Sequence, residues 1–314
     1  MDAKKIRTKQ ESKAFANPKG KKQILAIDIG YSSVKLYHEN GCTCFPAYAK
    51  KLEGDILIAD SQDILYRENS DSDVFIIGYN AQNMASHIDA TDSETELYGR
   101  KRYTSNSFKA IYRAALALSL KDKADNREIA IQTGLPSAFY KGDTPTIQKV
   151  MAGTHSFDLK IGTEAWKHFT FNIKEENVAV MPQPLGTFYS VMTLNDGTMS
   201  NGKSEGSIPS AKELLYKNVL VMDIGFGTFD FYGTKNRTAE TDKKVSKNDV
   251  GMKAVLTEVS KEIMDTYSVD IPVPSLQKCL ETGNIEVFDE EPLTSDYKSI
   301  KEIVDKANDI VFER

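Results

Sequence analysis

Short apolar runs separated by turn residues dominate the sequence from residue 23 onward. Nearly continuous or alternating apolar patterns predict β-strands at residues 23–28, 34–38, 54–58, 74–78, 128–136 and 218–223. Asn40-Gly41 follows the second of these runs and is a strong hairpin signal. The run at 218–223 is the most continuous of the set, so we expect it to be a buried strand.

Other segments carry apolar side chains at helical spacing, or no periodicity at all. Helices are predicted at residues 104–120, 250–264 and 300–311. Residues 169–181 look extended, and Pro182-Gln183-Pro184 then breaks the chain before an apolar stretch that ends near residue 194. Residues 195–210 are rich in Gly, Ser and Asn and predict a loop or a domain boundary. Residues 1–22 show no hydrophobic period and predict a flexible arm.

Composition narrows the class of protein. The 314 residues are 40% hydrophobic and 27% charged, which is typical of a globular chain with a sizeable core. The net charge is −5, but residues 1–22 carry +6 and the remainder −11. An acidic body disfavours direct sequence-specific nucleic-acid binding. No apolar run has the length of a membrane span, so no membrane association is expected.

The three cysteines are too few for a disulfide framework, and no apolar segment follows the basic N-terminus as in a signal peptide. These observations favour a protein of the reducing cytoplasm.

The most informative feature is a near-repeat 195 positions apart. Asp28-Ile29-Gly30 and Asp223-Ile224-Gly225 each follow four apolar residues and precede a small hydroxyl residue and a second strand. We interpret each copy as a β-hairpin whose tight turn presents backbone N–H groups to an anion such as phosphate. The carboxylate would be repelled by phosphate, but it can hold Mg²⁺ through water or orient an attacking water molecule. Two such hairpins facing each other would enclose a polyphosphate.

With these residues in view, the sequence resembles the actin/Hsp70/sugar-kinase superfamily, and in detail the bacterial actin-like proteins of the ParM plasmid-segregation group. The two turns look like the phosphate-binding turns of that superfamily. Three further motifs carry the resemblance: Thr133-Gly134-Leu135-Pro136, Phe75-Ile76-Ile77-Gly78-Tyr79-Asn80-Ala81 and Met181-Pro182-Gln183-Pro184-Leu185-Gly186.

The resemblance covers about residues 23–264. It implies an α/β actin-like fold, with two duplicated ribonuclease-H-like domains flanking a nucleotide cleft. We expect domain I at residues 23–194 and domain II at 195–314.

The resemblance also implies a role for each residue of the two turns. Asp28 and Asp223 would hold Mg²⁺ through water, and Asp223 would also be a catalytic residue. Lys35 would contact the β-phosphate region. Phosphate-binding amides and hydroxyls would come from the remaining turn residues, which are Gly30, Tyr31, Ser32, Ser33, Gly225, Phe226, Gly227 and Thr228. Gln183 would orient the attacking water, while a hinge amide that satisfies backbone groups is its alternative role.

The implied function is a nucleotide-dependent, filament-forming ATPase in plasmid segregation. It would use ATP or GTP with Mg²⁺, and its partners would be copies of itself and an adaptor protein bound to plasmid DNA. The chain has no Gly-Gly pair, which the family carries in its adenosine-binding motif near the C-terminus. We therefore expect that the C-terminal part of the fold is missing from this sequence or that the nucleotide site is incomplete. A small-molecule kinase, a chaperone-like ATPase and a non-catalytic nucleotide-sensing module remain alternatives on the same fold.

A competing motif lies at residues 197–204, which match the P-loop pattern GxxxxGK[ST]. A P-loop needs a strand immediately before it and a helix that begins at its Lys-Ser. Residues 187–194 could provide the strand. However, Gly206 and Pro209 follow the motif closely and disfavour the helix. We therefore interpret this segment as a surface loop.

Overall fold

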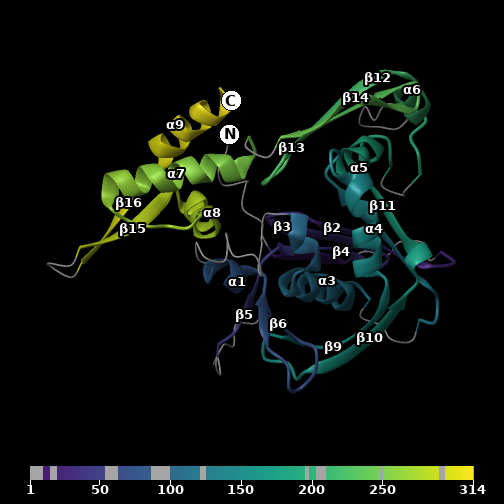
Figure 1. Cartoon of the computed structure of the whole chain (residues 1–314), viewed down its shortest axis with the longest axis horizontal. Helices are drawn as coiled ribbons and strands as arrows, with labels where there is room; N and C mark the ends of the chain where they lie inside the picture. The colour runs from purple at the N-terminus through teal and green to yellow at the C-terminus, as the bar shows by residue number, and fades with distance from the viewer. Residues whose placement is uncertain are drawn as a thin grey trace.

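The computed structural model of the chain (Figure 1) describes residues 10–14, 20–53, 63–85, 100–120, 125–194, 198–202, 210–247, 250–289 and 294–313. Within these ranges the strands form sheets of six, five, three and two strands. The six- and five-stranded sheets come from the first two thirds of the chain, and the smaller ones from the last third.

The six-stranded sheet carries the first of the repeated turns. Its order is β1-β4-β3-β2-β8-β11, in which β2, β3 and β4 are antiparallel and β8 and β11 run parallel to β2. The bounds are β1 Glu11–Ala14, β2 Gln23–Ile29, β3 Ser33–His38, β4 Gly41–Pro46, β8 Ile129–Leu135 and β11 Val178–Pro182. The strands predicted at 23–28, 34–38 and 128–136 are confirmed. The hairpin turn at Asn40-Gly41 is also confirmed, with Gly41 at φ 145°.

The prediction that residues 1–22 form a flexible arm is wrong for residues 11–14, which form strand β1. Glu11 pairs with Cys44 and Ala14 with Gly41, antiparallel to β4. All four side chains of β1 are exposed, so backbone hydrogen bonding to β4 forms the strand without a hydrophobic pattern. Of the rest of the predicted arm, residues 1–9 and 15–19 lie outside the described residues.

The five-stranded sheet has the order β10-β9-β6-β7-β5 and is antiparallel throughout. Its strands are β5 Ala49–Lys51, β6 Ile64–Arg67, β7 Phe75–Ile77, β9 Gly153–Ile161 and β10 Lys167–Ile173. The strand predicted at 74–78 is confirmed as β7, whereas the one predicted at 54–58 lies outside the described residues. The extended segment predicted at 169–181 consists of β10 and β11, separated by the 3₁₀ helix η3 (Glu175–Asn177).

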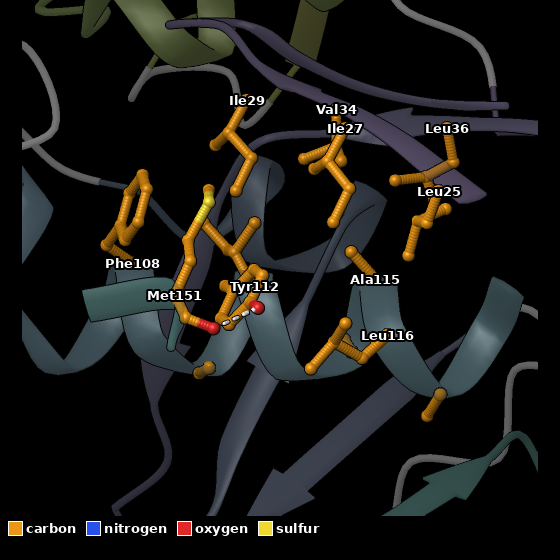
Figure 2. Close-up of a cluster of buried hydrophobic side chains, with 14 of the residues drawn as sticks. Leu25, Ile27, Ile29, Val34, Leu36, Phe108, Tyr112, Ala115, Leu116 and Met151 are labelled. Atoms are coloured by element: carbon orange, nitrogen blue, oxygen red, sulfur yellow. Dashed lines mark hydrogen bonds between the residues drawn. The ribbon is translucent and has the colours of Figure 1, made fainter. Parts of the chain in front are cut away.

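Helix α3 (Asn106–Ser119) packs between these two sheets and forms the main core (Figure 1). Ser105 caps it by accepting a hydrogen bond from the backbone N–H of Phe108 at 3.1 Å. Figure 2 shows one face of α3 against the inward side chains of β2 and β3. These inward side chains are Leu25, Ile27, Ile29, Val34 and Leu36, and all are 6% exposed or less. The helix predicted at 104–120 is confirmed.

Four shorter helical elements complete this part of the molecule. They are α1 Tyr79–Asn83, the 3₁₀ helix η2 Arg100–Thr104, α4 Tyr140–Met151 and α5 Gln183–Ser190. The side chains of Phe188 and Met192, in and just after α5, pack with Val221 and Tyr232 of the later three-stranded sheet. The hydrophobic contacts therefore group α5 with the later strands, and the domain boundary between residues 194 and 195 stays a prediction.

The three-stranded sheet carries the second repeated turn. It consists of β12 Asn218–Ile224, β13 Phe229–Lys235 and β14 Thr238–Lys247, with α6 Ala211–Tyr216 just before it. The strand predicted at 218–223 is confirmed, but the expectation that it is buried is wrong. Leu220, Met222 and Ile224 are 52%, 61% and 59% exposed, because α5 covers only the opposite face of the sheet, where Val221 lies.

The last part of the chain forms a separate hydrophobic cluster around α7 (Figure 1). It contains α7 Met252–Tyr267, α8 Val273–Thr282, the hairpin β15 Asn284–Asp289 with β16 Thr294–Ser299, and α9 Lys301–Phe312. The helices predicted at 250–264 and 300–311 are confirmed as α7 and α9. The predicted apolar face of α7 is buried at Val255, Leu256, Val259 and Ile263.

Candidate functional site

The first repeated turn joins β2 to β3. The backbone N–H of Gly30 donates to the carbonyl of Ser33 at 2.9 Å and closes the turn. Asp28 and Lys35 lie opposite each other in the ladder, and the Lys35 Nζ is 3.6 Å from the Asp28 Oδ2. The turn thus places one carboxylate and one ammonium group side by side at the mouth of the hairpin.

The second turn joins β12 to β13 with the same backbone geometry. The N–H of Gly225 donates to the carbonyl of Thr228 at 2.8 Å. A Cβ atom added to Gly30 or to Gly225 would lie 3.1 Å from the carbonyl oxygen that closes the respective turn. The sequence repeat is therefore a structural repeat, and glycine occupies the same tight position in both copies.

Gln183 connects β11 and α5 to the first turn. Its side-chain Nε2 donates to the Asp28 Oδ1 at 2.8 Å. Gly134, at the end of the neighbouring strand β8, permits this approach, because an added Cβ would lie 2.8 Å from the Gln183 Cγ. The predicted motifs around residues 133–136 and 181–186 thus meet at one point beside Asp28.

Both turns and Gln183 line a single cleft of about 1340 Å³. All twelve predicted site residues contribute to its walls: Asp28, Gly30, Tyr31, Ser32, Ser33, Lys35, Gln183, Asp223, Gly225, Phe226, Gly227 and Thr228. The pKa of Asp223 is raised, first by burial and then by the negative charges of Asp230 and Asp28. The two repeated acids therefore lie close enough to influence each other electrostatically.

The sequence analysis did not find two buried residues of this cleft. Asp230 is 2% exposed and accepts hydrogen bonds from the Thr228 hydroxyl at 2.8 Å and from the Ser137 backbone N–H at 3.1 Å. Asp230 occupies the position in the second copy of the repeat that Lys35 occupies in the first. This correspondence is the sequence signal that could have identified Asp230. Arg102 is 8% exposed and lies behind the first turn, and no motif in the sequence marks it.

A family model of the N-terminal domain of actin-like proteins matches residues 26–186, more than half of the chain. The chain belongs to the actin-like proteins. The match contains the first turn, the Gly134 strand end and Gln183, and thereby confirms the resemblance carried by those motifs. A comparison with curated protein sequences gives no match.

Solved structures of bacterial and archaeal actin-like proteins share the fold. A non-polymerisable quadruple mutant of pCBH ParM aligns with a TM-score of 0.68, and a 15-stranded ParM filament from Clostridium botulinum with 0.65. In both cases the identity is 19%, and the alignment covers 92% of this chain and 81% of the other. An archaeal actin homologue in complex with ADP aligns with a TM-score of 0.58 at 12% identity, covering 93% of this chain and 79% of the other. At these identities the likeness establishes the actin-like α/β fold.

The competing P-loop has no strand before it in this actin-like chain. Residues 183–190 form helix α5, so the stretch at 187–194 does not supply the required strand. Gly197, Lys203 and Ser204 of the motif lie outside the described residues.

Within the described ranges, no three His, Cys, Asp or Glu side chains cluster as a metal site, and no helix is long and apolar enough to cross a membrane.

Proposed function

We propose that this actin-like protein is a nucleotide-dependent, filament-forming ATPase. The observation that carries the proposal is the convergence of two Asp-Ile-Gly turns, 195 residues apart, on one cleft. Each turn offers backbone amides suited to phosphate oxygens, and each brings one carboxylate. A polyphosphate is the ligand class that matches paired anion-binding turns in a cleft of this size.

The residues of the cleft fit a magnesium–nucleotide complex. Mg²⁺ is usually held by one or two carboxylates together with phosphate oxygens and water, so Asp28 and Asp223 are sufficient without a third ligand. The pKa of Asp223 is raised first by burial and then by the negative charges of Asp230 and Asp28, and a bound cation would neutralise this local negative charge. When bound, Mg²⁺ would supply charge neutralisation for the phosphates.

The chain's own residues then position the reactants. The turn residues of both hairpins hold the phosphates, with Lys35 as a point charge for the β-phosphate region. Gln183, fixed by its hydrogen bond to Asp28, orients the attacking water. A glutamine amide does not take up a proton at neutral pH, so its contribution is orientation, as is usual in phosphoryl transfer.

Self-association and plasmid segregation belong to the same proposal. ATP would favour closure of the cleft, closure would favour stacking of subunits, and hydrolysis would weaken the filament. The partners would be further copies of the chain and an adaptor protein bound to plasmid DNA, in the cytoplasm. The solved ParM filament of the same fold supports the self-association. The described part of the structure does not favour ATP over GTP.

Light scattering and phosphate release with Mg·ATP and Mg·GTP test this proposal. We expect assembly that requires a triphosphate, followed by phosphate release. Turnover that a sugar or acid stimulates, without assembly, would favour a small-molecule kinase. Binding without turnover or assembly would favour a nucleotide-sensing module.

Asp223→Ala is the decisive variant. We expect hydrolysis to fall by ~10²-fold or more, the usual loss when one positioned electrostatic group is removed, with the fold retained. Asp309→Ala, at an exposed position on α9 outside the cleft, is the control and should hydrolyse like the wild type. Retained turnover in Asp223→Ala together with loss in Lys203→Ala would point to the P-loop instead.

A further inference from the structure

Arg102 is a buried cation directly behind the first turn. It lies in η2, is 8% exposed and is surrounded by aromatic rings. Its guanidinium carbon is 4.2 Å from the ring centre of Tyr31, 5.4 Å from that of Tyr103 and 5.9 Å from that of Phe108. These rings hold the planar guanidinium in place, a geometry in which arginine and lysine are not interchangeable.

None of the residues that the structure describes provides a counter-ion for the guanidinium group. It donates to the carbonyl oxygens of Ile29 at 2.5 Å and Gly30 at 2.9 Å, and its Nε has no hydrogen-bond partner. Among the described residues, no carboxylate oxygen lies within 4.0 Å of it. Arg113 is a useful contrast, because it is also 8% exposed but lies 2.9 Å from the Glu68 Oε1. A buried charge without a partner is unfavourable, which suggests that an anion completes the environment of Arg102.

The hydrogen bonds of Arg102 reach two peptide groups of the first turn. A trans peptide places its N–H opposite its carbonyl, so the bond from Arg102 to the Gly30 carbonyl leaves the Tyr31 N–H facing away from the guanidinium. A hydrogen bond at the carbonyl polarises the peptide and strengthens its N–H as a donor. The bond to the Ile29 carbonyl acts likewise on the Gly30 N–H, which closes the turn.

Arg102 also lies beside the contact between the two turns. The Tyr31 ring lies against Gly227 of the second turn so closely that an added Cβ there would be 2.4 Å from the Tyr31 Cδ2 and 2.8 Å from its Cγ. The Arg102 guanidinium also lies against this ring. Tyr31 therefore contacts both Arg102 and Gly227 of the second turn, so that a change at Arg102 reaches the contact between the turns.

We propose that Arg102 is a positioning residue for the polyphosphate, acting through the peptide groups of the first turn and the Tyr31 ring, and that the phosphates supply its missing counter-charge. This inference rests on the proposed nucleotide-dependent function. It adds a residue outside the repeated motifs to the phosphate site and explains why an uncompensated arginine is buried there.

Calorimetric titration of Arg102→Met with Mg·ATP and with magnesium tripolyphosphate tests the inference. We expect the affinity for both ligands to fall by about tenfold or more, because a unit charge within several ångströms is removed from a poorly solvated site. The loss of affinity should be of similar size for the two ligands, since Arg102 acts on the phosphates and not on the nucleoside. Arg113→Met is the matched control, because it removes an equally buried arginine outside the cleft and leaves Glu68 paired with Lys109. It should lower the melting temperature without weakening either ligand.

A second pair of variants covers the case in which Arg102→Met does not fold. Arg102→Lys keeps the charge but does not donate to both carbonyls in one plane, so we expect a severalfold loss of affinity that Arg113→Lys does not show. Equal affinities in Arg102→Met and the wild type, or equal losses in the Arg102 and Arg113 variants, would overturn the inference. If the wild type binds neither ligand, the proposed function itself fails, and the two failures are therefore distinguishable.

Discussion

The hairpins β2–β3 and β12–β13 share their turn geometry but differ in what surrounds them. Their turns close with equivalent hydrogen bonds of 2.9 and 2.8 Å. However, Leu25 in β2 is fully buried on the side of the strand that faces α3 (Figure 2), whereas its repeat counterpart in β12, Leu220, is 52% exposed. The comparison teaches that the local sequence sets the strand and the turn, while burial depends on the element that packs against the strand.

The two turns also differ in charge. Opposite Asp28 the first hairpin carries the exposed cation Lys35, whereas opposite Asp223 the second carries the buried acid Asp230. Thus the first hairpin has a local counter-charge and the second concentrates negative charge. This asymmetry is consistent with a site that needs an external cation at one side of a bound polyphosphate.

The largest expected effect comes from the difference in burial. Leu25→Ala should lower the free energy of unfolding by about 2–5 kcal/mol, because it opens a cavity between β2 and α3. Leu220→Ala should cost less than about 1 kcal/mol, since half of that side chain already contacts solvent. Urea unfolding followed by circular dichroism measures both. Equal losses would mean that the exposed face of β12 is covered in solution.

The contact between the turns gives an intermediate effect. Gly227→Ala should destabilise the protein by about 1–3 kcal/mol and weaken Mg·ATP binding, because the added methyl group displaces the Tyr31 ring. Gly142→Ala, within α4, is the control: its added Cβ meets only an ordinary contact at 3.6 Å, and alanine favours the helix. Calorimetry measures the Mg·ATP affinity and thermal unfolding measures the stability. Equal affinities and equal stabilities of the two variants would contradict the expectation.

The smallest expected effect is the pH dependence caused by Asp223. Its raised pKa means that the folded state binds its proton more tightly than the unfolded state does. The resulting stabilisation is present below the unfolded value of about 3.9 and is lost as the pH rises through the raised folded value. Asp223→Asn should therefore melt slightly higher than the wild type at pH 7, by roughly 2 °C. The difference in melting temperature between the two proteins should shrink at pH 4. A difference of the same size at pH 4 and pH 7 would contradict this expectation.

The sequence predicted more of the turns than of their surroundings. The strands on both sides of each turn, the helix face of α7 and the twelve cleft residues follow from spacing, from glycine positions or from the family resemblance. Asp230 and Arg102 were missed because their importance depends on partners distant in sequence: Ser137 for Asp230, and the carbonyls of the first turn for Arg102. Strand β1 was missed because its side chains are all exposed and only its backbone is paired.

The sequence by itself determined the strands on both sides of each turn, the helices α3, α7 and α9 and the two tight turns, because those depend on residues a few positions apart. The tertiary structure alone decided which faces are buried, how Gln183 reaches Asp28 and where the buried Arg102 contacts the carbonyls of the first turn. The physical reason is that burial and buried charge are set by the surroundings that the whole chain provides. A segment's own pattern of residues does not specify those surroundings.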